Sequence, residues 1–226
     1  MSSKLSKKDL KGPDAFQSTF ERLTDYVSAN KTRVAVVATA LCLAVVVVLG
    51  VYFYWNYYSS SALKLYAKAQ QNMIQKGDNK ETNEENIIIF NDLIKKYPYS
   101  WSGRMALYHL GNIHYNNADF DDAVEAYKKF LSKTRKDNTG IKFLALTSLG
   151  YAYEAKKDYE KALQAFEEAM DTYNVGFEMI GLRNIARTYE ALNNKEKALE
   201  YYKKALDKTT EPSSIIFIKK KISALS

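Results

Sequence analysis

The chain has one unbroken apolar run near its N-terminus, and after it the hydrophobic residues are interspersed with polar ones. The run is Val34–Trp55, which holds no charge, follows Lys31 and Arg33, and ends among tyrosine, phenylalanine and tryptophan side chains. A helix rises about 1.5 Å per residue, so a run of this length crosses the roughly 30 Å hydrocarbon core of a membrane. Aromatic residues gather at the headgroup level. The pattern predicts a single transmembrane helix with an aromatic collar over residues 34–58.

The segment before this run, residues 1–33, is basic and amphipathic, with 7 Lys and Arg against 4 Asp and Glu. Asp14 can cap a helix there. Four apolar residues then recur on one helical face: Phe16, Phe20, Leu23 and Val27. An amphipathic helix beside a membrane span lies on the membrane surface. We therefore expect a juxtamembrane surface helix here, and the alternative is a helix that merely continues the span.

The distribution of cations around the run predicts its orientation. Lys31, Arg33 and the basic tail lie before it, and the first charge after it is Lys64. Cytoplasmic flanks carry the excess of Lys and Arg, so we expect a cytoplasmic N-terminus and a translocated domain over residues 59–226. Within that domain, Ser59–Ser61 are expected to cap a new helix.

The composition beyond the run points to helices and to no nucleic-acid partner. Glycine occurs 9 times and proline 3 times in 226 residues, whereas Ala, Leu, Lys, Glu and Tyr are abundant. The net charge of +7 is spread out: residues 34–226 hold 26 of the 33 Lys and Arg and 22 of the 26 Asp and Glu. Mixed charges of this kind are typical of a solvated helical surface. The one cysteine, Cys42, lies inside the apolar run, which excludes a disulfide framework.

Three segments of the chain align without gaps: Leu110–Phe130, Leu149–Ala169 and Ile185–Ala205. Each begins near a small residue, carries an alanine twelve residues later and an aromatic residue four further on. These triplets are Gly111, Ala123 and Tyr127; Gly150, Ala162 and Phe166; and Ala186, Ala198 and Tyr202. Self-similarity at a period of 36–39 residues indicates a repeat architecture.

The spacing has a mechanical reason. Two antiparallel helices in a hairpin approach closely only where both carry small residues, so Gly111 is expected opposite Ala123 and its counterparts likewise. The aromatic residues are expected to fill the wider gaps toward the neighbouring hairpin. Polar pairs mark the turns: Asp119-Phe120, Asp158-Tyr159 and Asn193-Asn194.

This pattern resembles the tetratricopeptide repeat (TPR), whose 34-residue unit has small residues at positions 8 and 20 and aromatic residues at 11 and 24. An earlier, degenerate unit matches at Phe90 and Pro98 but has Asn86 where a small residue is usual, and Phe130 departs from the small residue at position 27. After Pro212, a helix carries the residues expected to cover the last repeat, Ile215, Ile216, Ile218 and Ile222, with Lys219–Lys221 in solvent. The prediction is an all-α fold: one N-terminal transmembrane helix, a TPR α-solenoid of three clear repeats and one degenerate repeat, and a C-terminal capping helix.

The layout also resembles a narrower family, the bacterial YfgM-like proteins, through its FERLTDYVSANKTR run, its span and its repeats. That resemblance implies a short cytoplasmic segment, an inner-membrane anchor and a periplasmic TPR domain. It further implies association with the SecYEG protein-export channel and a chaperone-like holding role for translocating or unfolded client proteins.

Motifs of enzyme chemistry are missing from the sequence. His109 and His114 are the only histidines, and a spacing of five does not place them on one helix face for a metal. The sequence contains no Gly-rich phosphate loop and no nucleophile elbow. We expect no catalytic residues, no cofactor, no metal and no small-molecule substrate.

A stack of helix hairpins presents a concave surface formed by the first helix of each repeat, and this surface binds peptides. The TPR resemblance assigns positions 2, 5, 9 and 12 to it. The predicted groove residues are Tyr108, Asn112, Tyr115, Thr147, Tyr151, Glu154, Arg183 and Arg187, with Met105, Leu144, Ile180 and Glu190 at the remaining positions. The alternative is that Tyr108 and Tyr151 only pack between repeats. A carboxylate clamp is disfavoured because Tyr108 and Ile180 stand where that family has lysines.

The sequence therefore predicts a non-enzymatic, membrane-anchored TPR adaptor that binds proteins at the periplasmic face of the inner membrane. Two alternatives remain open, a structural scaffold of an envelope complex and an organelle protein-import receptor. The number of different partners that the protein binds, and the side of the membrane on which its TPR domain lies, distinguish the three functions.

Overall fold

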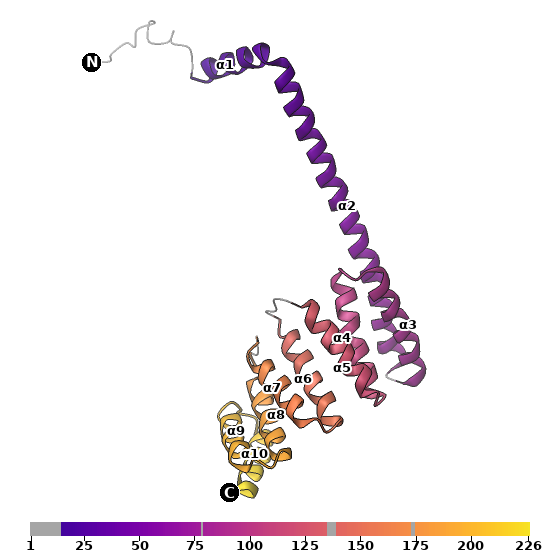
Figure 1. Ribbon diagram of the computed structural model, residues 1–226, viewed down its shortest axis with the longest axis vertical. Helices are drawn as coiled ribbons and strands as arrows, with labels where there is room; N and C mark the ends of the chain where they lie inside the picture. Colours follow the sequence, from indigo (N-terminus) through magenta and orange to yellow (C-terminus); the bar gives the residue numbers. More distant parts are fainter. Residues whose placement is uncertain (1–14, 78, 135–138, 173–174) are drawn as a thin grey trace, which may run out of the picture. The chain divides into compact units, whose positions relative to one another are not determined.

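The computed structural model describes residues 15–77, 79–134, 139–172 and 175–226, with side chains from residue 18 onward. Within these ranges the chain is built of α-helices without a strand (Figure 1), which confirms the predicted all-α class. The helices are α1 (Ala15–Ala29), α2 (Lys31–Lys76), α3 (Lys80–Lys96), α4 (Trp101–Asn116), α5 (Phe120–Lys133), α6 (Ile141–Ala155), α7 (Tyr159–Met170), α8 (Glu178–Ala191), α9 (Lys195–Leu206) and α10 (Pro212–Leu225). Asp14, the predicted cap of α1, lies outside the described residues.

Helix α2 contains the whole apolar run and continues well beyond it, for 46 residues. Its length and composition make it a candidate membrane span. The expected helix start at Ser59–Ser61 is wrong, because α2 passes through these serines without a break. Serine lowers helix propensity only slightly, no Pro or Gly lies between Val51 and Lys76, and the flanking residues include strong helix formers.

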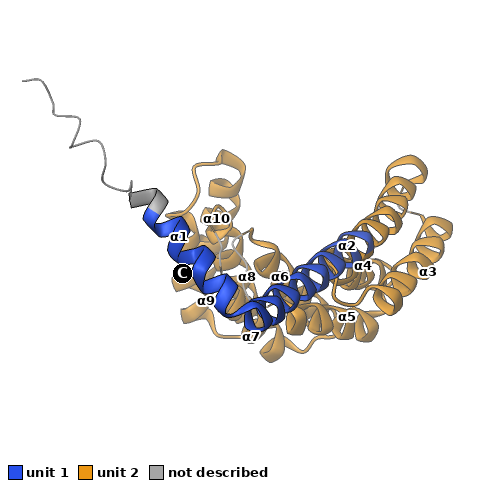
Figure 2. Cartoon of the chain, turned by 90° about the horizontal axis from the view of Figure 1, so that it is seen from above, with its two compact units in different colours: residues 1–57 blue, residues 58–226 orange. Residues whose placement is uncertain are grey.

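The chain divides into two compact units, one ending at Tyr57 and the other running from Tyr58 to Ser226 (Figure 2). The first holds α1 and the N-terminal part of α2. The second holds the rest of α2 and all helices from α3 to α10, and it contains every predicted repeat.

The three clear repeats are the hairpins α4–α5, α6–α7 and α8–α9. Their turns share one geometry: a residue with positive φ, namely Ala118 (65°), Lys157 (61°) or Asn193 (59°), precedes the residue that caps the second helix. The backbone N–H of that capping residue donates to a carbonyl five residues earlier, as from Asp158 to Tyr153 at 2.9 Å. The predicted turn pairs are therefore shifted slightly, since Phe120 and Tyr159 are already the first residues of their helices.

In the hairpins α4–α5 and α6–α7, close packing depends on the missing side chain of a glycine. A Cβ added to Gly111 would lie 2.4 Å from Cε1 of Tyr127, and one added to Gly150 would lie 2.4 Å from Cε1 of Phe166. The rings of Tyr127 and Phe166 thus lie over the glycine of their own hairpin, in addition to packing near the next one. The contact with the glycine of the same hairpin thus adds to the expected packing toward the neighbouring hairpin.

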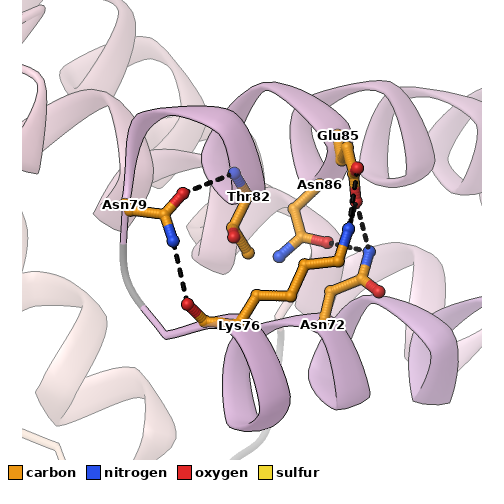
Figure 3. Close-up of polar contacts among 6 residues, drawn as sticks. All are labelled: Asn72, Lys76, Asn79, Thr82, Glu85 and Asn86. Atoms are coloured by element: carbon orange, nitrogen blue, oxygen red, sulfur yellow. Dashed lines mark hydrogen bonds and ion pairs between the residues drawn. The ribbon is translucent and has the colours of Figure 1, made fainter.

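The degenerate first hairpin, formed by the end of α2 and α3, uses amides where the others use small residues (Figure 3). Asn86 is fully buried, and its Oδ1 accepts a hydrogen bond from Nδ2 of Asn72 at 3.2 Å. Lys76 forms an ion pair with Glu85 at 2.7 Å, and Asn79 caps α3 by accepting from the N–H of Thr82 at 3.0 Å. Asn72 and Asn86, which this hydrogen bond joins, are fourteen residues apart in the sequence.

Helix α10 covers the last hairpin, as predicted, through Ile218. This side chain is fully buried against Ala186, Tyr202 and Ala205, and Ile222 packs beside it. Ile216 was expected in the same contact but is 68% exposed, because it lies about 200° around the helix from the buried Ile218.

Candidate protein-binding surface

The predicted groove residues come from the first helices of successive repeats, α4, α6 and α8. Three of them, Asn112, Tyr115 and Tyr151, line one open cavity of about 290 Å³. Three further lining residues were missed by the sequence analysis: Asn116, Tyr127 and Ser148. Tyr127 belongs to α5, and its predicted role was packing alone; no signal in the repeat pattern marks its hydroxyl as part of this surface.

Hydrogen bonds hold the polar side chains of this cavity in place. The hydroxyl of Tyr127 donates to Oδ1 of Asn112 at 2.8 Å, which leaves the Nδ2 hydrogens of Asn112 as donors for another acceptor. The ring of Tyr115 packs edge-on against Phe120, with centroids 5.6 Å apart. Burial raises the pKa of Tyr127, so this hydroxyl stays protonated and remains a donor. The cavity therefore presents oriented amide and hydroxyl groups, which suit the backbone of an extended peptide.

A polar cluster joins α6 to α8 on the same side. Nδ2 of Asn184 donates to the hydroxyl of Tyr151 at 2.9 Å, and the guanidinium of Arg187 lies 5.4 Å from the centroid of the Tyr151 ring. Arg187 also forms a two-point ion pair with Glu154, at 3.2 Å from Nε to Oε1 and 2.5 Å from Nη2 to Oε2. Burial opposes the charge of Arg187, but the Glu154 carboxylate outweighs it, so the pKa of Arg187 is raised.

The other predicted residues contribute less to an accessible surface. Tyr108 is half-buried, with its ring centroid 5.7 Å from that of Phe130 and 6.1 Å from that of Tyr127, both on α5 of the same hairpin. Thr147 is only 6% exposed and lies beneath the surface. Arg183 is half-buried on α8. The structure thus brings together Asn112, Tyr115 and Tyr151 around the cavity, and Tyr151, Glu154 and Arg187 beside it.

Asn184 and Thr188 were missed because both are buried within α8. Their partners lie across the repeat boundary, Tyr151 for Asn184 and Glu154 for Thr188, the latter at 3.2 Å. No group of His, Cys, Asp and Glu in the described ranges is arranged to hold a metal ion.

A comparison with models of protein families shows which family the chain belongs to. Residues 35–226 match the model of the tetratricopeptide repeat-like domain. The chain belongs to this family. TPR domains are protein–protein interaction scaffolds, and the predicted TPR fold is confirmed.

Solved structures of TPR proteins share the fold at low sequence identity. A crystal structure of MamA protein matches with a TM-score of 0.59 at 20% identity, covering 74% of this chain and 81% of that one. A TPR protein from Parabacteroides merdae gives 0.60 at 17% identity, covering 74% and 60%. PilF of Pseudomonas aeruginosa gives 0.55 at 19% identity, covering 74% and 68%. No curated protein matches the chain.

Proposed function

We propose that this TPR protein is a membrane-anchored adaptor that binds polypeptide segments along α4, α6 and α8. The observation that carries the proposal is the cavity between α4 and α6, where Asn112, Tyr115 and Tyr151 meet. Tyrosine provides large contact area at low entropic cost, and an asparagine amide bonds readily to a peptide backbone. The cavity is open and half polar, which suits many peptide sequences better than one small ligand.

Helix α2 supports the second part of the proposal, the anchor. A helix that is apolar over Val34–Trp55 and continues directly into the first hairpin would hold the binding surface close to a membrane. Tethering raises the local concentration of any polypeptide that emerges there. We place the N-terminus in the cytoplasm and the TPR unit in the periplasm, next to the export channel, as the YfgM-like resemblance implies.

Photo-crosslinking in intact cells tests the binding surface. Tyr151 is replaced by benzoylphenylalanine, which retains an aromatic ring at the cavity, and the exposed Lys129 on α5 is replaced in a control strain. Capture of many exported proteins from position 151, but not from position 129, supports the adaptor. One stoichiometric partner would favour a structural scaffold, and capture of lipid alone would contradict a binding role for this surface.

Cysteine labelling tests the orientation separately. In a Cys42→Ser background, a cysteine replaces the exposed Ser132 on α5. A membrane-impermeant maleimide should label it in spheroplasts without lysis. Labelling only after lysis would place the TPR unit in the cytoplasm and favour the import-receptor class of function.

A further inference from the structure

A second cavity, of about 400 Å³, opens between α5, α6 and α7. It shares no lining residue with the cavity between α4 and α6. Part of its lining is aliphatic, from Leu131, Leu146 and Leu149. Its volume lies at the lower end of the range for ligand pockets, which is enough for one or two side chains.

Two ammonium groups at this cavity face a single aromatic ring. Nζ of Lys128 on α5 lies 5.8 Å from the centroid of the Tyr153 ring, and Nζ of Lys161 on α7 lies 5.7 Å from it. Lys161 is paired with Asp158 at 2.6 Å. Lys128, by contrast, has no carboxylate within 4.0 Å among the residues that the structure describes. Among the described residues, Lys128 therefore brings to this cavity a positive charge without an ion-pair partner.

The equivalent ring of the next repeat, Tyr189, has a different pair of charged residues around it. Tyr189 corresponds to Tyr153, three residues after the small residue of its repeat, and Lys197 corresponds to Lys161. The position of Lys128, five residues after the alanine of the second helix, is held by Glu167. There the hydroxyl of Tyr189 donates to Glu167 at 3.3 Å while Nζ of Lys197 lies 5.1 Å from the ring centroid, so one anion balances one cation.

The preceding junction has no such cation pair either. The equivalent positions around His114 are Asn91 and Asp122. Of the three junctions, the middle one alone has lysines at both of these positions. Lys161 already has Asp158 as its partner, so a carboxylate that enters the cavity would pair with Lys128.

We propose that this middle cavity binds an acidic peptide segment. A carboxylate of the segment pairs with Lys128 beside the Tyr153 ring, and a neighbouring aliphatic side chain contacts Leu131, Leu146 and Leu149. Glu168 also lines the cavity, and its Oε1 lies 4.0 Å from Nζ of Lys142. This site lies apart from the surface on α4, α6 and α8 and gives the protein a second, charge-selective contact with a partner.

Fluorescence anisotropy with a defined peptide tests the site. The full chain is placed in phosphatidylcholine nanodiscs and titrated against a fluorescein-labelled hexapeptide of alternating leucine and glutamate. A hexapeptide of alternating leucine and glutamine is the neutral control. We expect the acidic peptide to bind more tightly, and Lys128→Glu to weaken it about ten-fold by reversing a charge at the contact. Lys203→Glu, the same change at the equivalent position of the third repeat, should leave the affinity unchanged.

A gain-of-site variant makes the test independent of lost stability. Glu167→Lys places two lysines around Tyr189 and should add binding of the acidic peptide to the Lys128→Glu protein. Equal binding of the acidic and neutral peptides would overturn the proposal, as would equal effects of Lys128→Glu and Lys203→Glu. Lys128-dependent binding to phosphatidylglycerol nanodiscs without binding to the acidic peptide would overturn it in favour of a lipid headgroup.

Discussion

Arg187 on α8 and Glu154 on α6 form a two-point ion pair that joins the second and third repeats. Glu154 also accepts from the hydroxyl of Thr188, so its carboxylate is bonded to two side chains of α8. The side chain of Glu154 is 17% exposed and that of Arg187 is 42% exposed. The pair thus lies at the edge of the surface, where it both fixes the spacing of two repeats and borders the candidate binding site.

Arg187→Met should lower the free energy of unfolding by about 1 kcal/mol, because it leaves a mostly buried carboxylate with one weaker partner. The double variant Glu154→Gln/Arg187→Met should recover part of this loss, since no charge is then left unpaired. Thermal unfolding followed by circular dichroism measures both. Lys204→Met removes an exposed pair with Glu200 and should cost less than half as much; equal losses for Lys204→Met and Arg187→Met would contradict a special role for the α6–α8 pair.

Gly111→Ala should destabilise the first clear repeat by about 1–3 kcal/mol, the usual range for overpacking. The new Cβ would lie 2.4 Å from one carbon of the Tyr127 ring and 2.6 Å from another, so the ring must move. Chemical denaturation measures the loss, and Tyr127→Leu should make the same Gly111→Ala change less costly. Gly50→Ala is the control, because nothing lies within 4 Å of an added Cβ there.

Ala118→Gly should stabilise the turn between α4 and α5 by about 0.5–1 kcal/mol. Ala118 has φ of 65°, a left-handed conformation that a Cβ disfavours by roughly 1–2 kcal/mol, although glycine returns part of this gain as unfolded-state entropy. Asn193→Gly, at the equivalent turn, should change stability less because asparagine tolerates this conformation. A larger gain at position 193 than at 118 would contradict this account.

Spacing alone was enough to predict the hairpins, because small and aromatic residues recur at fixed offsets in every repeat. Gly111 and Gly150 lie against the aromatic ring of the second helix of their hairpin, and Ala186 packs in one cluster with Tyr202. The helix through Ser59–Ser61 could not be predicted the same way, since a serine run is compatible with a cap and with a helix interior. Whether these serines cap a helix or lie inside one depends on how the residues before and after them pack.

Hydrogen bonds between residues of different repeats could not be predicted from the sequence, for a different reason. Asn184 is buried, and nothing in the repeat pattern distinguishes an asparagine that bonds to Tyr151 from a poorly packed core residue. The assignment by repeat position selected Asn112, Tyr115 and Tyr151, which line one cavity. It could not identify that Thr147 is covered by its neighbours, because coverage depends on side chains from other helices.

His109 gives the solenoid a pH dependence that can be measured. Its ring stacks on Phe90 at 5.5 Å, and its Nε2 lies 2.7 Å from the hydroxyl of Tyr66 and 3.0 Å from Nε2 of Gln70. Both neighbours can donate to an unprotonated Nε2, which fits the neutral ring. Burial lowers the pKa of His109 from 6.5 to about 4.

Because the folded state resists protonation of His109 and the unfolded state accepts it near pH 6.5, stability falls as the pH is lowered through 6.5 and levels off near pH 4. The full loss is on the order of 3 kcal/mol, from 1.36 kcal/mol for each unit of pKa difference. Urea unfolding at pH 7.5, 6.0 and 5.0 measures it. His109→Gln keeps a polar side chain that does not titrate and should flatten the profile over this range, whereas His114→Gln keeps His109 and should retain the slope. Parallel profiles for the wild-type chain and His109→Gln would show that another group sets the pH dependence.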